Sequence, residues 1–558
     1  MVVPGQDNQP STSNNDRFLV LKLSEDDPLF QKKIKLLRDK GFGQADLVRF
    51  DDTLVPDSVN ANLDALLQRA RIIHLNETEL YFGVGVMNMN LEEEVYSPRN
   101  ELEALNFILS RLDRCREKSV EENVSLKAVR DAIITRIYSF GDTYKMETNI
   151  IKDTCDSEKH LMEWAETHGL KSKLNIAYIE GAGRGVLAAE DLEVGDIALE
   201  IPISVIISED LVYKSDMIPV LEKIEGISAE TMLLLWSMRE RHNVDSKYKI
   251  YFDTLPEQFN TGLSFGLDAM VALDETLALD EIFQAKEHLR SEYDELFPAL
   301  FDKFPDLFSR ELYTWEQYLW ACELFYSNSM KIMFPDGKLK TCLIPVPGFL
   351  NHSVCPHILH YGKVDTVTNT LKFPLSRPCS RGEQCYLSYG NLPSSHLLTF
   401  YGFLPQEMNP FDIIPLDIEA APECTSEEGH LDSTTHMVRG TWLSTNQGIF
   451  NYGLPSPLLE HLRHVGKPDL QTMTLFQENL ENEIKVLDEL RVIFENMMDK
   501  LGDSEMDDWN NIKWDVQLAV RYKDLQRNIV SSILTACHSG RKMVERELEK
   551  CLDEDKLG

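Results

Sequence analysis

The stretch from Ile344 to Leu404 constrains this chain more than any other part of its sequence. It begins as IPVPGFLNHSVCPH, so the polar triplet Asn351-His352-Ser353 directly follows the apolar pair Phe349-Leu350. Polar side chains entered from an apolar run tend to be buried, and buried polar groups need hydrogen-bond partners. We therefore expect the triplet to lie inside the fold, tied to another segment of the chain.

The same stretch ends as RGEQCYLSYGNLPSSHLLTFYGFL, after a predicted pair of strands. Cys385 to Tyr389 reads as a short strand ended by Gly390, which puts Tyr389 at a strand end, where a side chain can face a cleft. Pro393-Ser394-Ser395 then starts a helix, and Gly402 closes it. The sequence thus predicts strand, turn and helix around an exposed tyrosine.

A glycine-rich segment, IEGAGRGVLAAEDLEVGDIALEIP, runs from Ile179 to Pro202. A dinucleotide-binding loop would need a helix directly after its glycines. Here Val186 to Ala188 and Ile197 to Ile201 read as strands instead. This meander argues against a Rossmann fold, including the Rossmann-type methyltransferases, and the glycines instead allow the backbone to approach a ligand closely.

Length and charge restrict the class of protein further. A chain of 558 residues is too long for one hydrophobic core. The net charge of -36 argues against nucleic-acid binding. It would attract basic partners such as lysine-rich protein segments, while solubility alone is the other explanation of such a charge. The ten cysteines contain no CxxC pair, which indicates neither a zinc cluster nor a disulfide framework and suits a reducing compartment. No apolar run is long enough to span a bilayer.

Together, Asn351-His352-Ser353, Ser388-Tyr389-Gly390, Tyr401-Gly402-Phe403 and the upstream glycine-rich turn resemble a SET domain. The resemblance is to the Rubisco large-subunit methyltransferase group, which also includes the actin-histidine methyltransferase. Ser246 to Phe265 resembles the helical insertion that splits the SET domain in this group. The last helix, with AVRYKDLQRNIVSSIL, resembles the end of its helical substrate-binding domain.

This resemblance implies an α+β fold, in which a SET-type β-fold is split by a helical insertion. A mainly helical region precedes that fold and an all-α domain follows it. We predict a disordered tail at 1–16, a mainly helical accessory region at 17–150 and a SET domain at 160–405 with its insertion at about 210–325. A linker at 406–430 and a helical substrate-binding domain at 431–558 complete the predicted chain.

The resemblance also implies a function, S-adenosylmethionine-dependent methylation of a lysine in a protein. Glu180-Gly181-Ala182 is expected along the cofactor through backbone atoms. Asn351 and His352 are expected to hold its adenosine part, the histidine chiefly through its main chain. Tyr389 matches the catalytic tyrosine, whose hydroxyl lies beside the transferring methyl, and Tyr401 matches the second aromatic wall of the channel.

Two positions depart from the group's pattern. Gly348 stands where its members usually carry Asp, and Asn328 or Tyr326 stands where an Arg usually meets the cofactor carboxylate. Losing one charged hydrogen bond costs ~1.5–3 kcal/mol, although nearby Lys331 offers a substitute. The alternative is therefore a catalytically weakened SET-like protein that serves as an interaction scaffold. A histidine acceptor is a variant of the first hypothesis.

The remaining expectations concern ligands and location. His352, His357 and His360 suggest a metal cluster, but no carboxylate or cysteine set stands at ligand spacing, so we predict no metal. The expected partner is a protein substrate of basic character, with no nucleic acid and no membrane. Asp7 and Asp16 make a poor transit peptide, which favours the cytoplasm or nucleus and leaves a plastid address open.

Overall fold

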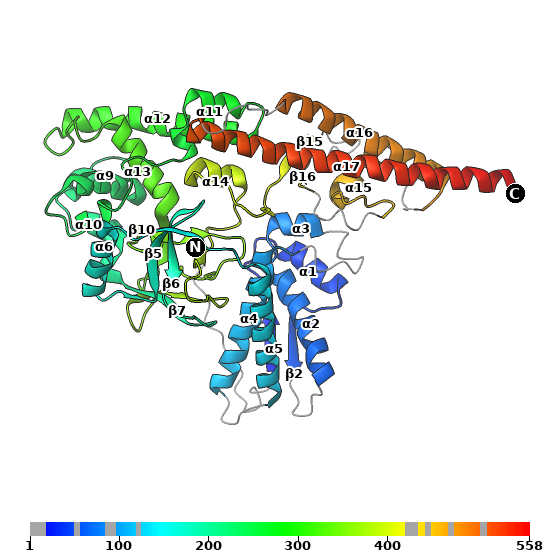
Figure 1. The fold of residues 1–558 in the computed structure, drawn as a ribbon, viewed down its shortest axis with the longest axis horizontal. Helices are drawn as coiled ribbons and strands as arrows, with labels where there is room; N and C mark the ends of the chain where they lie inside the picture. The colour runs from blue at the N-terminus through cyan, green and yellow to red at the C-terminus, as the bar shows by residue number, and fades with distance from the viewer. Residues whose placement is uncertain are drawn as a thin grey trace.

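The computed structural model describes residues 18–49, 56–83, 96–118, 124–418, 434–440, 448–466, 474–502 and 511–557. The predicted tail at 1–16 and the acidic run Glu92-Glu93-Glu94 lie outside these residues. The fold is α+β, as predicted (Figure 1). Within the described residues, no helix is long and apolar enough to cross a membrane.

Several small sheets form the β-structure of the central part of the chain. One contains β3 (Ile150–Asp153), β5 (Leu174–Ile179) and β6 (Gly183–Ala188) in the order β3-β5-β6. A second has the order β12-β13-β7-β4, from β4 (Lys171–Ser172), β7 (Ile197–Pro202), β12 (Val364–Asp365) and β13 (Thr370–Pro374). A third has the order β8-β10-β9, from β8 (Ile207–Ser208), β9 (Ser329–Met333) and β10 (Leu339–Leu343). The two strands predicted after the glycines are confirmed, but they do not form the predicted meander, because β6 pairs with β5 and β7 pairs with β13 and β4 in another sheet.

Helices precede, interrupt and follow these strands. Between β3 and β4 comes α6 (Asp156–Thr167). The interrupting helices are η4 (Ile203–Val205), α7 (Glu209–Val212), α8 (Ile218–Leu221), α9 (Ala229–His242), α10 (Lys249–Phe252), η5 (Gly262–Ser264), α11 (Leu267–Ala272), α12 (Leu277–Lys303) and α13 (Trp315–Asn328). Then follow η6 (Pro347–Phe349) and α14 (Ser394–Tyr401). In the segment that resembles the helical insertion, the aromatic side chains are expected in the core, and three of them are buried: Tyr248, Tyr251 and Phe252.

The N-terminal region is mainly helical, as predicted, and forms a bundle at one side of the sheets (Figure 1). Its helices are α1 (Phe30–Asp39), α2 (Pro56–His74), α3 (Glu77–Gly83), α4 (Pro98–Lys118) and α5 (Val124–Thr143). We did not predict its antiparallel pair of strands, β1 (Phe18–Lys22) and β2 (Ala45–Arg49). Leu359 and Cys355, from the loop before β12, are buried in the same hydrophobic cluster as these helices.

That shared cluster docks the N-terminal region on the sheets, and polar contacts reinforce the docking. Asn106 Nδ2 donates to the Ser376 carbonyl at 2.9 Å. At the other end, the Tyr81 hydroxyl is 3.0 Å from His436 Nδ1, in the C-terminal part of the chain. The N-terminal region therefore contacts both of the other parts.

The C-terminal part is built on long helices, in agreement with the helical region expected after the SET-type fold. It contains α15 (Ser456–Gly466), α16 (Gln477–Leu501) and α17 (Trp514–Leu557), and α17 runs along the top of the molecule in Figure 1. Two strands were not predicted: β15 (Ile414–Ile418), in the predicted linker, pairs with β16 (Thr434–Val438), in the region predicted to be all-helical. The start of α17 packs on α11 and α14, burying Val516 and Val520 beside Ala269 and Leu398.

Candidate active site

The polar triplet lies where two distant segments of the chain meet. Asn351-His352 forms β11, which pairs in parallel with β14 (Tyr386–Leu387). β14 is shorter than the predicted strand, and Tyr389 follows just after its end. The 3-10 helix η6 precedes β11, and Pro347 supplies its first position, where a missing N–H costs nothing. This turn delivers the triplet to the sheet directly from an apolar segment.

Asn351 connects this region to the glycine-rich strand. Its Nδ2 donates to the Arg184 carbonyl of β6 at 2.9 Å. A Cβ added at Gly185 would lie 3.0 Å from Asn351 Nδ2 and 2.7 Å from Ile179 Cδ1. A side chain at position 185 would therefore force the ends of neighbouring side chains to shift, whereas Gly181, at φ +73°, provides a left-handed turn.

His352 orients Tyr389. Its Nδ1 accepts a hydrogen bond from the Tyr389 backbone N–H at 3.1 Å, and the two rings stack with centroids 5.2 Å apart. Burial lowers the pKa of His352 to about 4, so the imidazole is neutral near pH 7. The His352 ring thus positions Tyr389. The sequence interpretation expects only a contact with the cofactor, made chiefly through the main chain of His352.

Tyr389 is fixed at both ends of its side chain. Its hydroxyl donates to the Leu350 carbonyl at 2.8 Å. Its ring stacks on Tyr401 with centroids 4.9 Å apart and planes 25° apart. Burial raises the pKa of Tyr389, so the phenol stays protonated and can act as a hydrogen-bond donor near neutral pH.

A cleft of about 520 Å³ opens beside these rings. Its size suits a small organic ligand. All seven residues predicted for the cofactor and the catalytic step line it: Glu180, Gly181, Ala182, Asn351, His352, Tyr389 and Tyr401. The glycine-rich turn and the polar triplet therefore share one cavity, although more than 160 residues separate them in the sequence.

Sequence reasoning missed other residues of this cleft. Phe259 and Thr261 lie in the segment from Ser246 to Phe265, which we interpreted only as part of the helical insertion. Gln384 directly precedes the predicted strand and stands two residues before Tyr386. Because side chains alternate between the two faces of a strand, this spacing could have placed Gln384 on the same face as Tyr386. It is 1% exposed, its Oε1 accepts from the Tyr386 hydroxyl at 2.8 Å, and its Nε2 has no partner among the described residues.

The two departures from the expected pattern lie against each other. A Cβ added at Gly348 would be 2.9 Å from Asn328 Oδ1. Both residues line the cleft, and Arg184 is the one Lys or Arg among the described residues that line it. Arg184 Nη1 is 3.5 Å from Glu158 Oε1, and its guanidinium lies 5.1 Å from the Phe349 ring centroid. Two positions at which the resemblance leads us to expect an aspartate and an arginine therefore lie next to each other, and neither carries a charge.

A second hollow, of about 560 Å³, adjoins the first. It receives residues from α4, from β9 and from the loop before β12, including Arg99, Lys331 and Tyr361. The two hollows share five lining residues: Ser327, Asn328, Gly348, Tyr389 and Tyr401. Tyr389 and Tyr401 thus border both spaces, as the walls of a channel between them would.

Within the described residues, one buried group has metal-ligand chemistry, namely His357, Cys379 and Cys385. Both imidazole nitrogens of His357 are already engaged. Nδ1 accepts from the Tyr386 N–H at 3.0 Å, so Nε2 carries the proton that faces Glu383 Oε1 at 3.2 Å. That tautomer leaves no lone pair for a metal. The cluster is therefore a hydrogen-bonded support for β14.

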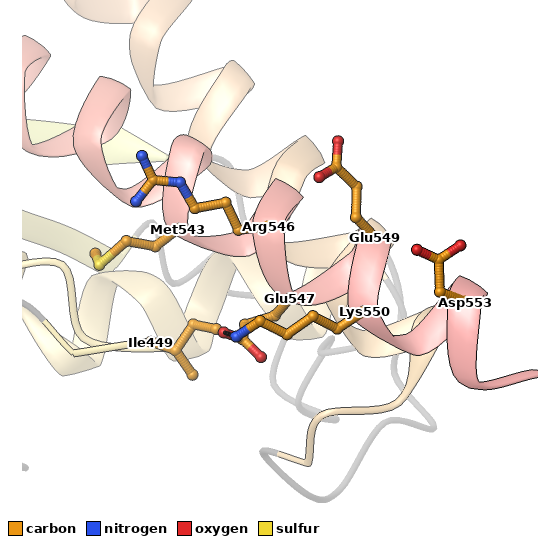
Figure 2. Close-up of a pocket in the computed structure, with 7 residues that line it drawn as sticks. All are labelled: Ile449, Met543, Arg546, Glu547, Glu549, Lys550 and Asp553. Carbon is orange, nitrogen blue, oxygen red and sulfur yellow. Dashed lines mark hydrogen bonds and ion pairs between the residues drawn. The ribbon is translucent and has the colours of Figure 1, made fainter.

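A further hollow, of about 580 Å³, lies near the C-terminal end of α17 (Figure 2). Ile449 is its single lining residue from outside that helix. Lys550 donates to Glu547 at 2.6 Å, whereas Glu549 and Asp553 point away from Ile449 (Figure 2). Because these groups do not converge, this hollow has no arrangement suited to chemistry.

Glu323 of α13, beside the cleft wall, makes the stability of the fold depend on pH. It is 3% exposed and accepts from Thr261 Oγ1 and Ser264 Oγ, each at 2.6 Å. Burial raises the pKa of Glu323 to about 7, while both hydroxyls and Lys286 act in the opposite direction. Its contribution to stability is therefore full below its ordinary pKa of 4.5 and is lost as pH rises through 7.

Glu323→Gln removes this titration and keeps an oxygen for both hydroxyls. We expect the variant to gain roughly 2 kcal/mol in unfolding free energy over wild type between pH 5 and pH 8. Urea unfolding at both pH values measures this change. A stability difference that is the same at both pH values would show that Glu323 stays charged in the folded protein.

The sheets, the β11–β14 pair and the helical insertion together form the SET fold. The chain resembles the SET-domain protein methyltransferases of the Rubisco large-subunit methyltransferase-like group. Among solved structures, the SET domain of LSMT bound to lysine and AdoHcy superposes with a TM-score of 0.50 at 18% identity, covering 70% of this chain and 92% of that one. Rubisco LSMT bound to sinefungin and monomethyllysine gives 0.51 at 17% identity, covering 70% and 94%.

Curated relatives agree with that resemblance. The [fructose-bisphosphate aldolase]-lysine N-methyltransferase, chloroplastic, of Arabidopsis thaliana is 24% identical over 264 residues, covering 46% of this chain and 53% of the relative. The actin-histidine N-methyltransferase of Homo sapiens is 22% identical over 316 residues, covering 54% and 51%. The chain thus spans about half the length of the curated relatives it matches. No protein-family model matches the chain.

Proposed function

We propose that this chain is an S-adenosylmethionine-dependent protein N-methyltransferase that modifies a lysine of another protein. The observation that carries the proposal is the pair of hollows that meet at Tyr389 and Tyr401. The first cleft, which contains the glycine-rich turn, is suited to the methyl donor. The second hollow, which Arg99, Lys331 and Tyr361 line, is suited to the acceptor side chain, and we call it the acceptor hollow. The relatives support a protein acceptor, since their names include an aldolase-lysine and an actin-histidine methyltransferase.

The residues of the first cleft fit such a donor. The turn Glu180-Gly181-Ala182 offers backbone groups, and Asn351 and His352 border the same space. Gln384 Nε2, buried and without a partner among the described residues, provides a donor for a ligand atom. When bound, S-adenosylmethionine supplies a methyl group on a positively charged sulfur.

The protein's own contribution is orientation and the exclusion of water. The Tyr389 hydroxyl and the Leu350 carbonyl lie together at the junction of the hollows, where oxygen atoms can accept weak C–H hydrogen bonds. Free lysine is neutral at pH 7 roughly once in 2,500, a handicap of ~4.6 kcal/mol. A channel walled by Tyr389 and Tyr401 lowers that handicap by desolvating the ammonium group.

A specific observation favours the second candidate function, an interaction scaffold with a weakened cleft. Gly348 and Asn328 leave the cleft without the charged pair that the resemblance implies. If Arg184 does not compensate, cofactor affinity falls by roughly ten- to a hundredfold. We favour the enzyme because the aromatic walls and the backbone turn remain assembled.

Calorimetric titration of the chain with S-adenosylmethionine separates the two functions. We expect a dissociation constant in the micromolar range, together with transfer of a labelled methyl group to proteins of a cell extract. Absence of both binding and transfer at saturating cofactor would reject the enzyme and leave the scaffold. Mass spectrometry of the labelled proteins distinguishes lysine from the histidine variant.

The compartment and the charge of the substrate are also proposals. We propose action in the cytoplasm or nucleus, with the plastid as the alternative because one relative is chloroplastic. The net charge of -36 points only weakly to a basic protein, because salt screens exposed charges beyond ~8 Å at physiological ionic strength. Charges within the acceptor hollow decide which sequence fits at short range.

A further inference from the structure

The acceptor hollow has a charge opposite to that of the whole chain. Three cations line it, Arg99, Lys331 and Lys363, and its lining contains no aspartate or glutamate among the described residues. His360 lies beside them. The chain as a whole carries a net charge of -36. A local excess of positive charge at the entrance to a reaction channel therefore calls for a specific explanation.

These cations are positioned by packed segments of the fold. Met333 N–H donates to the Gly362 carbonyl at 2.8 Å, and Met333 forms a parallel bridge with Lys363. Lys331 lies two residues before Met333 in β9, so the two lysines project from adjacent segments. Leu359, 5% exposed in the N-terminal hydrophobic cluster, anchors the loop that leads to Lys363.

The cations are also available to a ligand. Lys363 is exposed and has no hydrogen-bond or ion-pair partner among the described residues. Arg99 Nε is 4.0 Å from Glu103 Oε2. Lys331 pairs with Glu230, and both side chains are more than half exposed. The exposed Lys331–Glu230 pair contributes only ~0–1 kcal/mol, so an incoming carboxylate can compete for Lys331. The Arg99–Glu103 contact is partly buried but stands at the 4.0 Å limit of an ion pair, which leaves the guanidinium able to bind a second carboxylate.

We propose that the acceptor hollow binds a protein segment in which aspartate or glutamate flanks the methyl-accepting residue. Arg99, Lys331 and Lys363 pair with those carboxylates, so the N-terminal region supplies part of the substrate specificity through Arg99. This inference rests on the proposed methyltransferase function. The acidic remainder of the chain does not oppose it, because salt screens charges beyond ~8 Å at physiological ionic strength.

Methylation of cell-extract proteins with labelled S-adenosylmethionine tests this inference. Mass spectrometry of the products should find Asp or Glu within three or so positions of the modified residue. The double variant R99E/K363E should lower labelling at least ~10-fold, while calorimetry shows unchanged cofactor affinity. The charge-conserving variant R99K/K363R should stay within ~threefold of wild type. Lys303→Glu, an exposed charge reversal at the end of α12, should label as wild type does.

The failures of the two proposals are distinguishable. Wild-type labelling at sites flanked by Lys or Arg overturns the acidic specificity and leaves the methyltransferase intact. Equal labelling by wild type and R99E/K363E does the same. If wild type neither binds the cofactor nor labels any protein, the methyltransferase function fails, and the specificity fails with it.

Discussion

Replacing Tyr389 by Phe is expected to reduce methyl transfer by ~100-fold or more and to leave cofactor affinity within ~threefold of wild type. The substitution keeps the ring that stacks on Tyr401 at 4.9 Å and removes only the hydroxyl that donates to the Leu350 carbonyl. The cleft keeps its wall, while the reacting groups lose a fixed contact at the junction of the hollows. A displacement of about 1 Å at such a point can cost ~10²-fold in rate.

The measurement is the initial rate of labelled methyl transfer at saturating cofactor, combined with calorimetric titration of each variant. Tyr293→Phe is a matched control, because its hydroxyl also donates to a backbone carbonyl, that of Tyr313 at 2.9 Å, but lies in the helical insertion. Transfer by Tyr389→Phe at more than a third of the wild-type rate would remove the hydroxyl from the mechanism. A parallel loss of cofactor affinity would indicate a binding role instead.

Replacing Gly402 by Ala is expected to cause the largest loss of stability among single substitutions in the site region. Gly402 caps α14 at φ +75°, between the cleft residues Tyr401 and Phe403. A Cβ there would lie 1.8 Å from the Asn260 carbonyl oxygen and 2.7 Å from the carbonyl carbon. Backbone atoms cannot rotate away as a side chain can, so α14 must move away from the Asn260 segment.

The left-handed conformation alone costs an alanine ~1–2 kcal/mol. The forced backbone displacement adds ~1–3 kcal/mol. We therefore expect Gly402→Ala to lose about 2–5 kcal/mol in urea unfolding followed by tryptophan fluorescence. Gly382→Ala separates the two effects, because Gly382 has φ +80° and open space around its added Cβ. It should lose only the conformational part, and equal losses in the two variants would refute the clash.

Local signals were enough to predict the elements around the site. Pro393 and Gly402 delimit α14, and the turn between β5 and β6 follows from Gly181 and Gly183, both at positive φ. Helix ends and tight turns depend on a few neighbouring residues, so they can be read from a short window. The pairs β1–β2 and β15–β16 were missed because a short strand is stabilised by a distant partner.

By itself, the sequence determined which residues we expect at the site and the order in which they occur, because residue type and spacing are local properties. Only the tertiary structure decided that the Arg184 carbonyl meets Asn351, and that Gly348 lies against Asn328. It alone brought Arg99 from the N-terminal region to the acceptor hollow. The reason is physical: such meetings follow from the packing of whole elements against each other, which no short window of sequence contains.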